Sequence, residues 1–361
     1  MTLKCGIVGL PNVGKSTFFN ALCNKSKAEA SNYPFCTIEP NKALVAVKDE
    51  RIKKLANIAQ SEKTIFAQVE FVDIAGLVKG ASKGKGLGNK FLANIREVDL
   101  IIHLVRCFND ENITHVEGRI DPLEDTDIIL TELMLADLDS LEKRLPNLQK
   151  KARSGNKEQK LELEIVTNLI SSLSKGTLVK NFEKFQKYKN QIQNLSLLTS
   201  KKIIYVCNVS EEDMASGNQF TKKIEEKAKK EDAKVIKICA KLEEELIIFE
   251  DEKEKLESLK NLGISESAID KVIRASYYEL GLHSYFTVGK KEAKMWTIKK
   301  GTNTKKSAGV IHSDFEKGFI KAEVISYNDY IQQKKNNVRI EGKDYIVQDG
   351  DIINFLFNKT T

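Results

Sequence analysis

Residues 9–17, GLPNVGKST, have the glycine and lysine spacing of a loop that wraps around phosphate. An apolar run typical of a buried strand precedes them, and a stretch typical of a helix start follows. Gly9 and Gly14 allow successive backbone N–H groups to turn toward a phosphate, and the new helix adds its positive end. Lys15 has the length to reach the β- and γ-phosphates, and the hydroxyl of Ser16 suits Mg²⁺. The nucleotide-binding residues expected in this loop are Asn12, Val13, Gly14, Lys15, Ser16 and Thr17.

Three further residues fall where a γ-phosphate and its metal ion would be sensed. Asp73 ends an apolar run, and its carboxylate is expected to hold Mg²⁺ through a water molecule. Gly76 has no side chain, so its backbone N–H could approach the γ-phosphate. Thr37 lies in a proline-flanked loop, and in P-loop NTPases such a threonine closes on Mg²⁺ only when a γ-phosphate is present. The sequence therefore predicts Ser16, Thr37 and Asp73 as metal ligands.

The residue after this Asp-x-x-Gly pattern bears on the rate of hydrolysis. Leu77 stands where many GTPases carry a glutamine that positions water, and a leucine side chain cannot do so. His115, in a loop after another strand-like run, is chemically suited to orienting water near neutral pH. A surface histidine without a role fits the same position. The catalytic candidates are thus Lys15, Gly76 and His115, with slow turnover expected of the isolated chain.

The four residues from Asn208 to Glu211 occupy the place where GTPases carry Asn-Lys-x-Asp, whose aspartate recognises guanine. Glu211 is one methylene longer than that aspartate, which should weaken discrimination for guanine. The Asn208 amide can both donate and accept hydrogen bonds, as adenine N7 and N6 require. The backbones of Val209 and Ala240 are expected beside the base. These residues alone leave ATP and GTP both open.

Strand-like runs that alternate with helical stretches must position these residues. They predict an α/β fold with a parallel sheet covered by helices on both faces. Because ligands bind at the carboxyl ends of such strands, the candidate residues should meet at one edge. The runs are residues 3–8, 43–47, 65–72, 100–105, 203–207 and 235–239.

A change of pattern at about residue 129 predicts an antiparallel helical hairpin. Apolar residues at 134, 138, 141, 145 and 148 alternate steps of four and three, as in a coiled-coil seam, and a second series runs from 161 to 173. Pro146 should kink or restart the first helix. The basic residues near the tip suit RNA phosphates, although a solvated helix face would look the same. They are Lys143, Arg144, Lys150, Lys151, Arg153, Lys157 and Lys160.

From about residue 277 short alternating runs, such as 284–288 and 295–299, predict a small β-domain. Its lysines lie near Tyr285, Phe286 and Trp296, and basic residues interleaved with aromatics can bind RNA. The aromatics could equally form the core of a small domain. The lysines are Lys290, Lys291, Lys294, Lys299, Lys300, Lys305 and Lys306.

Composition limits the remaining possibilities. The chain has 361 residues, 41% hydrophobic and 30% charged, as expected for a protein of two or three globular domains. The longest apolar runs fall short of the roughly 18 residues of a membrane span, and the N-terminus does not read as a signal peptide. Six scattered cysteines suit a reducing cytoplasm. The net charge of +7 permits a polyanionic partner without requiring one, and we expect a monomer.

The motifs GLPNVGKST, NYPFCTIEPN, DIAGLVKGASKGKGLGNKF and NVSE closely resemble those of the YchF/Obg-like ATPases, a translation-factor-related P-loop family. The resemblance covers nearly the whole chain. It implies a nucleotide-binding domain interrupted by the helical hairpin and followed by a TGS domain, a ubiquitin-like β-grasp. The expected boundaries are 1–128 and 200–276 for the nucleotide-binding domain, 129–199 for the hairpin and 277–361 for the TGS domain.

The resemblance also favours ATP over GTP. It implies a slow Mg²⁺-dependent ATPase that acts as a conformational switch on the ribosome, in translation or stress regulation. It likewise suggests the catalytic role of His115, and in some related NTPases an asparagine at the position of Asn12 helps to hold K⁺. A plain loop amide explains Asn12 as well. The alternatives are a GTPase switch of the same fold and an RNA- or ribosome-binding module with little catalysis.

Overall fold

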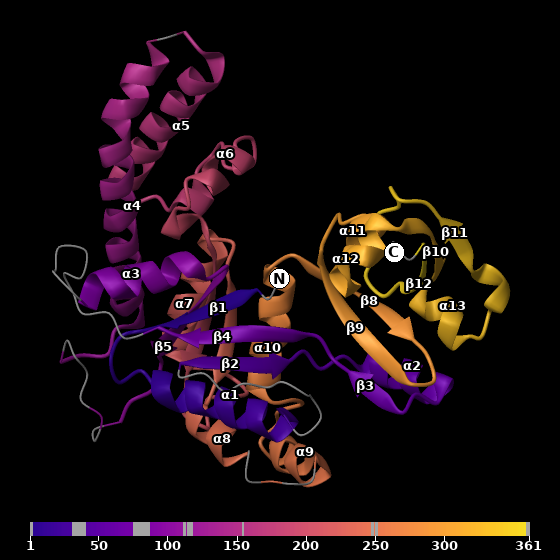
Figure 1. Ribbon diagram of the computed structural model, residues 1–361. Coiled ribbons are helices and arrows are strands. Elements are labelled where there is room, and N and C mark those ends of the chain that lie inside the picture. The colour runs from indigo at the N-terminus through magenta and orange to yellow at the C-terminus, as the bar shows by residue number, and fades with distance from the viewer. Residues whose placement is uncertain are drawn as a thin grey trace.

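The computed structural model describes residues 3–30, 41–74, 87–110, 113, 118–153, 155–246, 249 and 252–358 (Figure 1). These residues form a six-stranded sheet with its helices, a projecting helical hairpin and a second sheet at the C-terminal end. None of the helices within these ranges is long and apolar enough to cross a membrane.

The first sheet has six strands in the order β2-β4-β1-β5-β6-β7. Neighbouring strands are parallel except β2 and β4, which are antiparallel, so the expectation of a wholly parallel sheet is wrong at this edge. The reason is the connection, because the chain between β2 and β4 leaves the sheet instead of crossing over one of its faces. The strands are β1 (Lys4–Val8), β2 (Lys42–Ala46), β4 (Gln68–Asp73), β5 (Leu100–Arg106), β6 (Lys202–Asn208) and β7 (Lys234–Ile238).

Helices cover both faces of this sheet, as predicted (Figure 1). On one face α1 packs against α8, and α10 packs against β6 and β7. On the other face α4 packs against α7, and α3 lies against β1. The central strands are buried on both sides, with Ile7, Ile102 and Val206 each 0% exposed. The helices are α1 (Lys15–Ala30), α3 (Leu87–Glu97), α7 (Gln219–Lys230), α8 (Ala240–Glu245), α9 (Glu252–Asn261) and α10 (Ala268–Glu279).

The predicted hairpin consists of α4 (Pro122–Ala152) and α5 (Lys157–Ser174), which pack side by side (Figure 1). Their shared core includes Leu141, Leu148 and Leu169. The helix α4 continues through Pro146 without restarting, since the flanking leucines on both sides of the proline pack against α5. The chain returns through η1 (Val179–Asn181), α6 (Lys189–Asn194) and η2 (Leu198–Ser200).

The second sheet has the order β11-β10-β12-β8-β9-β3. One face is covered by α11 and α12, over a core that includes the fully buried Tyr285. Phe286 is also 0% exposed, but it belongs to the core that continues into the first sheet and its helices. The C-terminal elements are β8 (Leu282–Val288), β9 (Glu292–Lys299), α11 (Thr304–Ile311), α12 (Ser313–Lys317), β10 (Phe319–Ile325), α13 (Tyr327–Ile331), η3 (Lys335–Asn337), β11 (Arg339–Glu341) and β12 (Ile352–Phe357).

The sixth strand of this sheet comes from the N-terminal part of the chain. The helix α2 (Glu50–Ala59) packs on β8, β9 and α13, and β3 (Lys63–Ile65) pairs in parallel with β9. The prediction of one strand over residues 65–72 is therefore wrong, because the chain passes between two sheets at residues 66–67. Local sequence could not reveal this exchange, since the partner strand lies more than 200 residues away.

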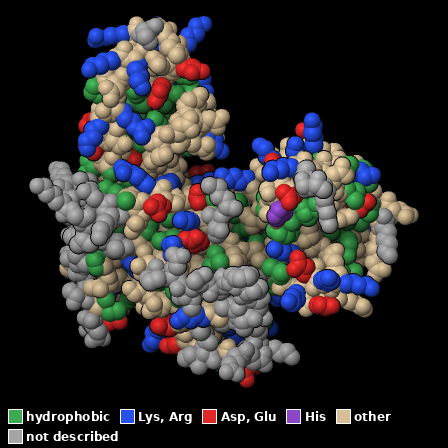
Figure 2. Space-filling model, viewed as in Figure 1, with side chains coloured by type: hydrophobic (Ala, Val, Ile, Leu, Met, Phe, Trp, Pro, Cys, Tyr) green, Lys and Arg blue, Asp and Glu red, His purple; other side chains and the backbone are tan. Residues whose placement is uncertain are grey.

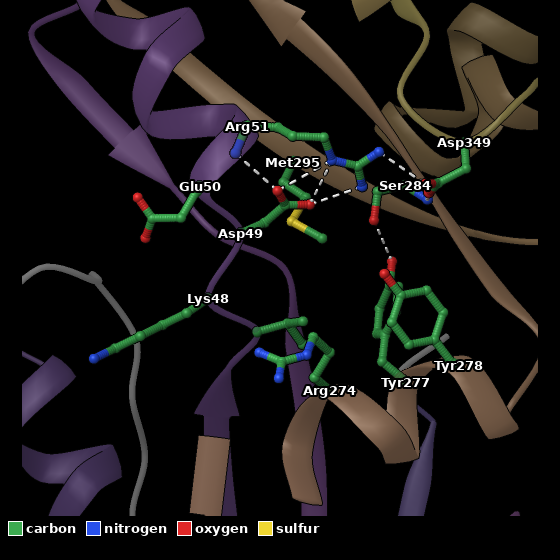
Figure 3. A pocket seen from close by; sticks show the side chains of 11 residues that line it. Lys48, Asp49, Glu50, Arg51, Arg274, Tyr277, Tyr278, Ser284, Met295 and Asp349 are labelled. Carbon is green, nitrogen blue, oxygen red and sulfur yellow. Dashed lines mark hydrogen bonds and ion pairs between the residues drawn. The ribbon is translucent and has the colours of Figure 1, made fainter. Parts of the chain in front are cut away.

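Arg51 holds the two units together at this junction (Figure 3). Its guanidinium donates to Asp49 and to Asp349, each with a contact of 2.8 Å. Asp349 in turn accepts the backbone N–H of Ser284 at 2.8 Å. A small cavity of about 190 Å³ lies beside this cluster, lined also by Tyr277 and other residues of both units.

Candidate nucleotide-binding site

The phosphate loop lies between β1 and α1, where its two glycines allow close approach. Gly14 has a φ of +93°, and a Cβ there would lie 2.3 Å from Nδ2 of Asn208. A Cβ on Gly9 would lie 2.8 Å from the carbonyl oxygen of Leu104 in β5. Only glycine fits both positions without displacement. Asn12 has a left-handed φ of 62°, a conformation that asparagine tolerates better than most residues.

Lys15 and Asp73 meet at the edge where β1 and β4 end. The Lys15 ammonium nitrogen lies 2.5 Å from Oδ1 of Asp73, and the side chains are 13% and 18% exposed. The structure therefore brings together the predicted phosphate-binding lysine and the predicted metal-binding carboxylate. Ser16 follows at the start of α1 and is exposed.

This pair fits the binding of a metal–nucleotide complex. The Ser16 hydroxyl and the Asp73 carboxylate are oxygen donors of the kind that Mg²⁺ prefers. The ammonium of Lys15 would exchange its carboxylate partner for phosphate oxygens, which would release Asp73 for a metal-bound water. The positive charge of Lys15 suits the phosphates, and the negative charge of Asp73 suits the metal ion.

Asn208 connects the phosphate loop to the turn that precedes α8. Its Nδ2 donates to the Val13 carbonyl, and its Oδ1 accepts the N–H of Ala240, both at 3.0 Å. The residue is 5% exposed, so this link is buried. The bond to Val13 uses one of the two hydrogens of Nδ2, and a base nitrogen could accept the second. Three predicted nucleotide-binding residues are thus joined through one amide.

The chain after β6 forms a compact turn that we call the base loop, residues 209–217. Val209 is 2% exposed, and its N–H donates to the Ile238 carbonyl of β7 at 2.8 Å. Glu211 is exposed, and its carbonyl accepts the N–H of Met214. The hydroxyl of Ser210 donates to Asp213 at 3.1 Å, which closes the turn around Glu211.

Arg106 organises the next loop, at the end of β5, and sequence reasoning did not identify it. The side chain is 1% exposed and lies over the ring of Phe108, 4.8 Å from its centroid. Its guanidinium donates to the carbonyls of Phe108, Asp110 and Ile113 at 2.9–3.2 Å. Burial lowers the pKa of this guanidinium. The sequence could not reveal that Arg106 binds this loop, because the acceptors are backbone carbonyls, which every residue type has.

Several predicted site residues cannot be placed. Thr37, Gly76, Leu77 and His115 lie outside the described residues, so the metal, γ-phosphate and catalytic roles assigned to them stay predictions. His103 lies in β5 and is 1% exposed.

Comparison with known proteins gives full-length matches. The family model YchF-GTPase_C, described as a protein of unknown function, matches residues 282–358, and MMR_HSR1, described as a 50S ribosome-binding GTPase, matches residues 4–136. The chain is 51% identical to the "Ribosome-binding ATPase YchF" of Haemophilus influenzae and 49% identical to that of Bacillus subtilis, covering 99% of this chain and 100% of each relative. A solved structure, of the Schizosaccharomyces pombe YchF GTPase, superimposes with a TM-score of 0.89 at 38% identity, covering 98% of both chains.

Proposed function

Because the chain belongs to the YchF family over its full length, we propose that it is a ribosome-binding P-loop ATPase that hydrolyses ATP to ADP and phosphate. The observation that carries this proposal is the contact between Lys15 and Asp73 beside the phosphate loop. It places a cation for the phosphates and a carboxylate for their metal ion at the end of two adjacent strands.

In this proposal the residues of the loop bind and neutralise the phosphates. Lys15 and the backbone N–H groups of residues 12–17 face the β- and γ-phosphates. Ser16 and Asp73 would hold Mg²⁺, joined by Thr37, and the bound ion would neutralise charge on the transferred phosphoryl group. Gly76 would sense the γ-phosphate through its N–H. The proposal requires no potassium ion.

The base would lie between the base loop and the turn before α8. Asn208 would position Val13 and Ala240 and offer its second amide hydrogen, while Glu211 and the Val209 backbone complete the contacts. The absence of a guanine-reading aspartate at residue 211 supports ATP. The ATPase name of the relatives supports the same choice.

Hydrolysis by the isolated chain should be slow. Leu77 cannot orient the attacking water, and we propose that His115 does so. The chain would then act as a switch, in which the nucleotide sets the shape of the loops that contain Thr37 and Gly76.

Two basic surfaces support an RNA-containing partner, the ribosome. Figure 2 shows lysine and arginine side chains gathered on the projecting hairpin and on the C-terminal unit. The seven basic residues near the hairpin tip are all exposed. In the C-terminal unit Lys294 lies over the Trp296 ring, 3.9 Å from its centroid, while Lys299 and Lys300 are exposed.

The domain assignment is part of the proposal. The hairpin would be a coiled-coil insertion at 129–199 within a nucleotide-binding domain of residues 1–128 and 200–276. The sheet and the two helices on its face support a TGS-type β-grasp at 277–361. Residues 50–65 pack against that domain and would be assigned to it, although they precede it in sequence.

The test combines nucleotide affinity with co-sedimentation on ribosomal subunits, with and without ATP, across a salt series. We expect ATP to bind more tightly than GTP, and ribosome binding to depend on ATP and to weaken as salt rises. Lys15→Ala should lose ATP hydrolysis, and Lys223→Ala on the outer helix α7 serves as the matched control. A strong preference for GTP would contradict the ATPase assignment. If the Lys15→Ala variant binds ribosomes equally well with and without nucleotide, the protein would instead be a binding module with little catalysis.

A further inference from the structure

Asn218, outside the predicted site, lies where the base loop meets α7. Its Oδ1 accepts the N–H groups of Phe220 and Thr221, both at 3.0 Å, so it is the N-cap of that helix. Its backbone N–H donates to the Thr221 hydroxyl at 2.9 Å, which completes a capping box. These bonds occupy the oxygen of the Asn218 side-chain amide, and they stabilise the first turn of α7.

The donor side of the same amide faces two other elements. Nδ2 donates to Oδ2 of Asp213 in the base loop and to the carbonyl of Cys107 after β5, both at 2.7 Å. Cys107 is itself fixed, because its N–H donates to the Asn208 carbonyl at 2.8 Å. The amide therefore ties the base loop to the end of β5 and, through it, to the strand that ends at Asn208.

Asp213 passes this restraint to the residue that would read the base. One carboxylate oxygen, Oδ2, accepts from both Asn218 and Ser210. Glu211 lies between Ser210 and Asp213, inside the turn that this oxygen closes. The turn that contains Glu211 is thus held by a chain of three hydrogen bonds that begins at Cys107.

We propose that Asn218 is a positioning residue for nucleotide selection, which holds the base loop in the conformation that presents Glu211 to the base. The proposal rests on the proposed nucleotide-binding function and deepens it. Asn218 need not touch the nucleotide, because it acts through Asp213 and Ser210. Removing the amide nitrogen frees the loop to adopt other conformations, in which an adenine and a guanine are distinguished less well.

The test separates helix capping from loop positioning. In Asn218→Ser the serine still caps α7 but supplies no amide nitrogen, and Asp213→Ala breaks the same link while leaving the cap intact. For each variant we expect the ratio of ATP affinity to GTP affinity to fall about three- to tenfold, the range for loss of one hydrogen bond. The double variant should lose less than the sum of the two single losses, since both substitutions remove the bond between Asn218 and Asp213. Backbone amides of residues 209–217 should exchange with solvent faster.

The control is Asn156→Ser, at the N-cap of α5, where the asparagine side chain accepts the N–H of Glu158. It makes the same substitution at the same helix position, far from the base loop, and should leave the ratio unchanged. An unchanged ratio in both single variants, or losses that add in the double variant, would overturn the positioning role. A wild-type preference for GTP would instead overturn the ATP assignment, while a shifted ratio in the variants would still support Asn218. Wild-type protein that binds neither nucleotide would overturn both.

Discussion

Individual buried side chains in this protein fix backbone segments, some of them near in sequence and some far apart. Asn208 joins the phosphate loop to the turn before α8, and Arg106 gathers three carbonyls of the loop after β5. Each does so with a buried polar group whose partners are backbone atoms. Burial makes such bonds expensive to lose, because water cannot replace them. The site is therefore held by polar side chains that do not themselves carry out chemistry.

His103 makes stability depend on pH at the level of one residue. It is 1% exposed in β5, and burial, with a contribution from the charge of Lys227, lowers its pKa from 6.5 to about 3. The unfolded chain takes up a proton below pH 6.5 that the folded chain cannot accept until near pH 3. The stability of the folded state is thus complete above pH 6.5 and is lost progressively as the pH falls toward 3.

The variant His103→Phe should remove this dependence. Between pH 7 and pH 5 the free energy of opening of β5 should fall by about 2 kcal/mol more in the wild type than in the variant. Native-state hydrogen exchange of the β5 amides at the two pH values measures the difference. If both proteins lose the same free energy over this interval, His103 does not titrate as its burial indicates.

Among the elements, the helical hairpin depends on one anchor at its base. Asp137 of α4 is 2% exposed, and its carboxylate accepts the N–H groups of Leu198 and Thr199 at 2.8 Å and the Thr199 hydroxyl at 2.7 Å. The Thr199 hydroxyl also accepts the N–H of Val179. This cluster fixes the returning chain against α4 just before β6 begins.

Asp137→Ala should loosen the base of the hairpin. Three donors would be left buried without their acceptor, at a cost of about 3 kcal/mol or more. We expect faster hydrogen exchange over residues 178–200, while nucleotide affinity changes little because the phosphate loop is not touched. Asp139→Ala, on the exposed part of α4, is the control, as its partner Lys143 is 74% exposed. Equal exchange in the two variants would argue against the anchor.

For the whole molecule, the arrangement of the two sheets is the decisive feature. The connection between β2 and β4 extends into the C-terminal unit, where β3 completes the second sheet and α2 covers part of its face. The strand β4 ends at Asp73, beside Lys15, and its other end leads directly to β3. A change at the nucleotide edge of β4 thus has a short covalent path to the C-terminal unit.

Arg51→Ala tests how firmly the two units are joined. The substitution removes the guanidinium that bonds Asp49 and Asp349, and it leaves two carboxylates facing each other. We expect a loss of about 1–2 kcal/mol in the stability of the junction, as for a partly buried charged hydrogen-bond network. Small-angle scattering should report a broader distribution of distances between the hairpin and the C-terminal unit. Lys53→Ala, in the same helix with its exposed partner Glu50, should leave scattering unchanged, and identical scattering from both variants would count against the junction.

The sequence by itself determined the parts of this protein that depend on local spacing. Short-range patterns predicted three features of the structure. These are the phosphate loop with its glycines and lysine, the strands β2, β5, β6 and β7, and the two helices of the hairpin. In each case the residues that decide the conformation lie within a few positions of one another, so steric and hydrophobic periodicity suffices.

Only the tertiary structure decided which distant residues meet. The contact of Lys15 with Asp73, the use of the Asn208 amide within the protein, and the bond from Asn218 to the Cys107 carbonyl all arise where separate strands end at one edge. The transfer of α2 and β3 to the second sheet depends on a partner more than 200 residues away, and the same detour of the chain returns β4 antiparallel to β2. Some hydrogen-bond partners are backbone atoms, and others come from distant strands. Neither kind leaves a pattern in the local sequence, because the packing of the chain selects them.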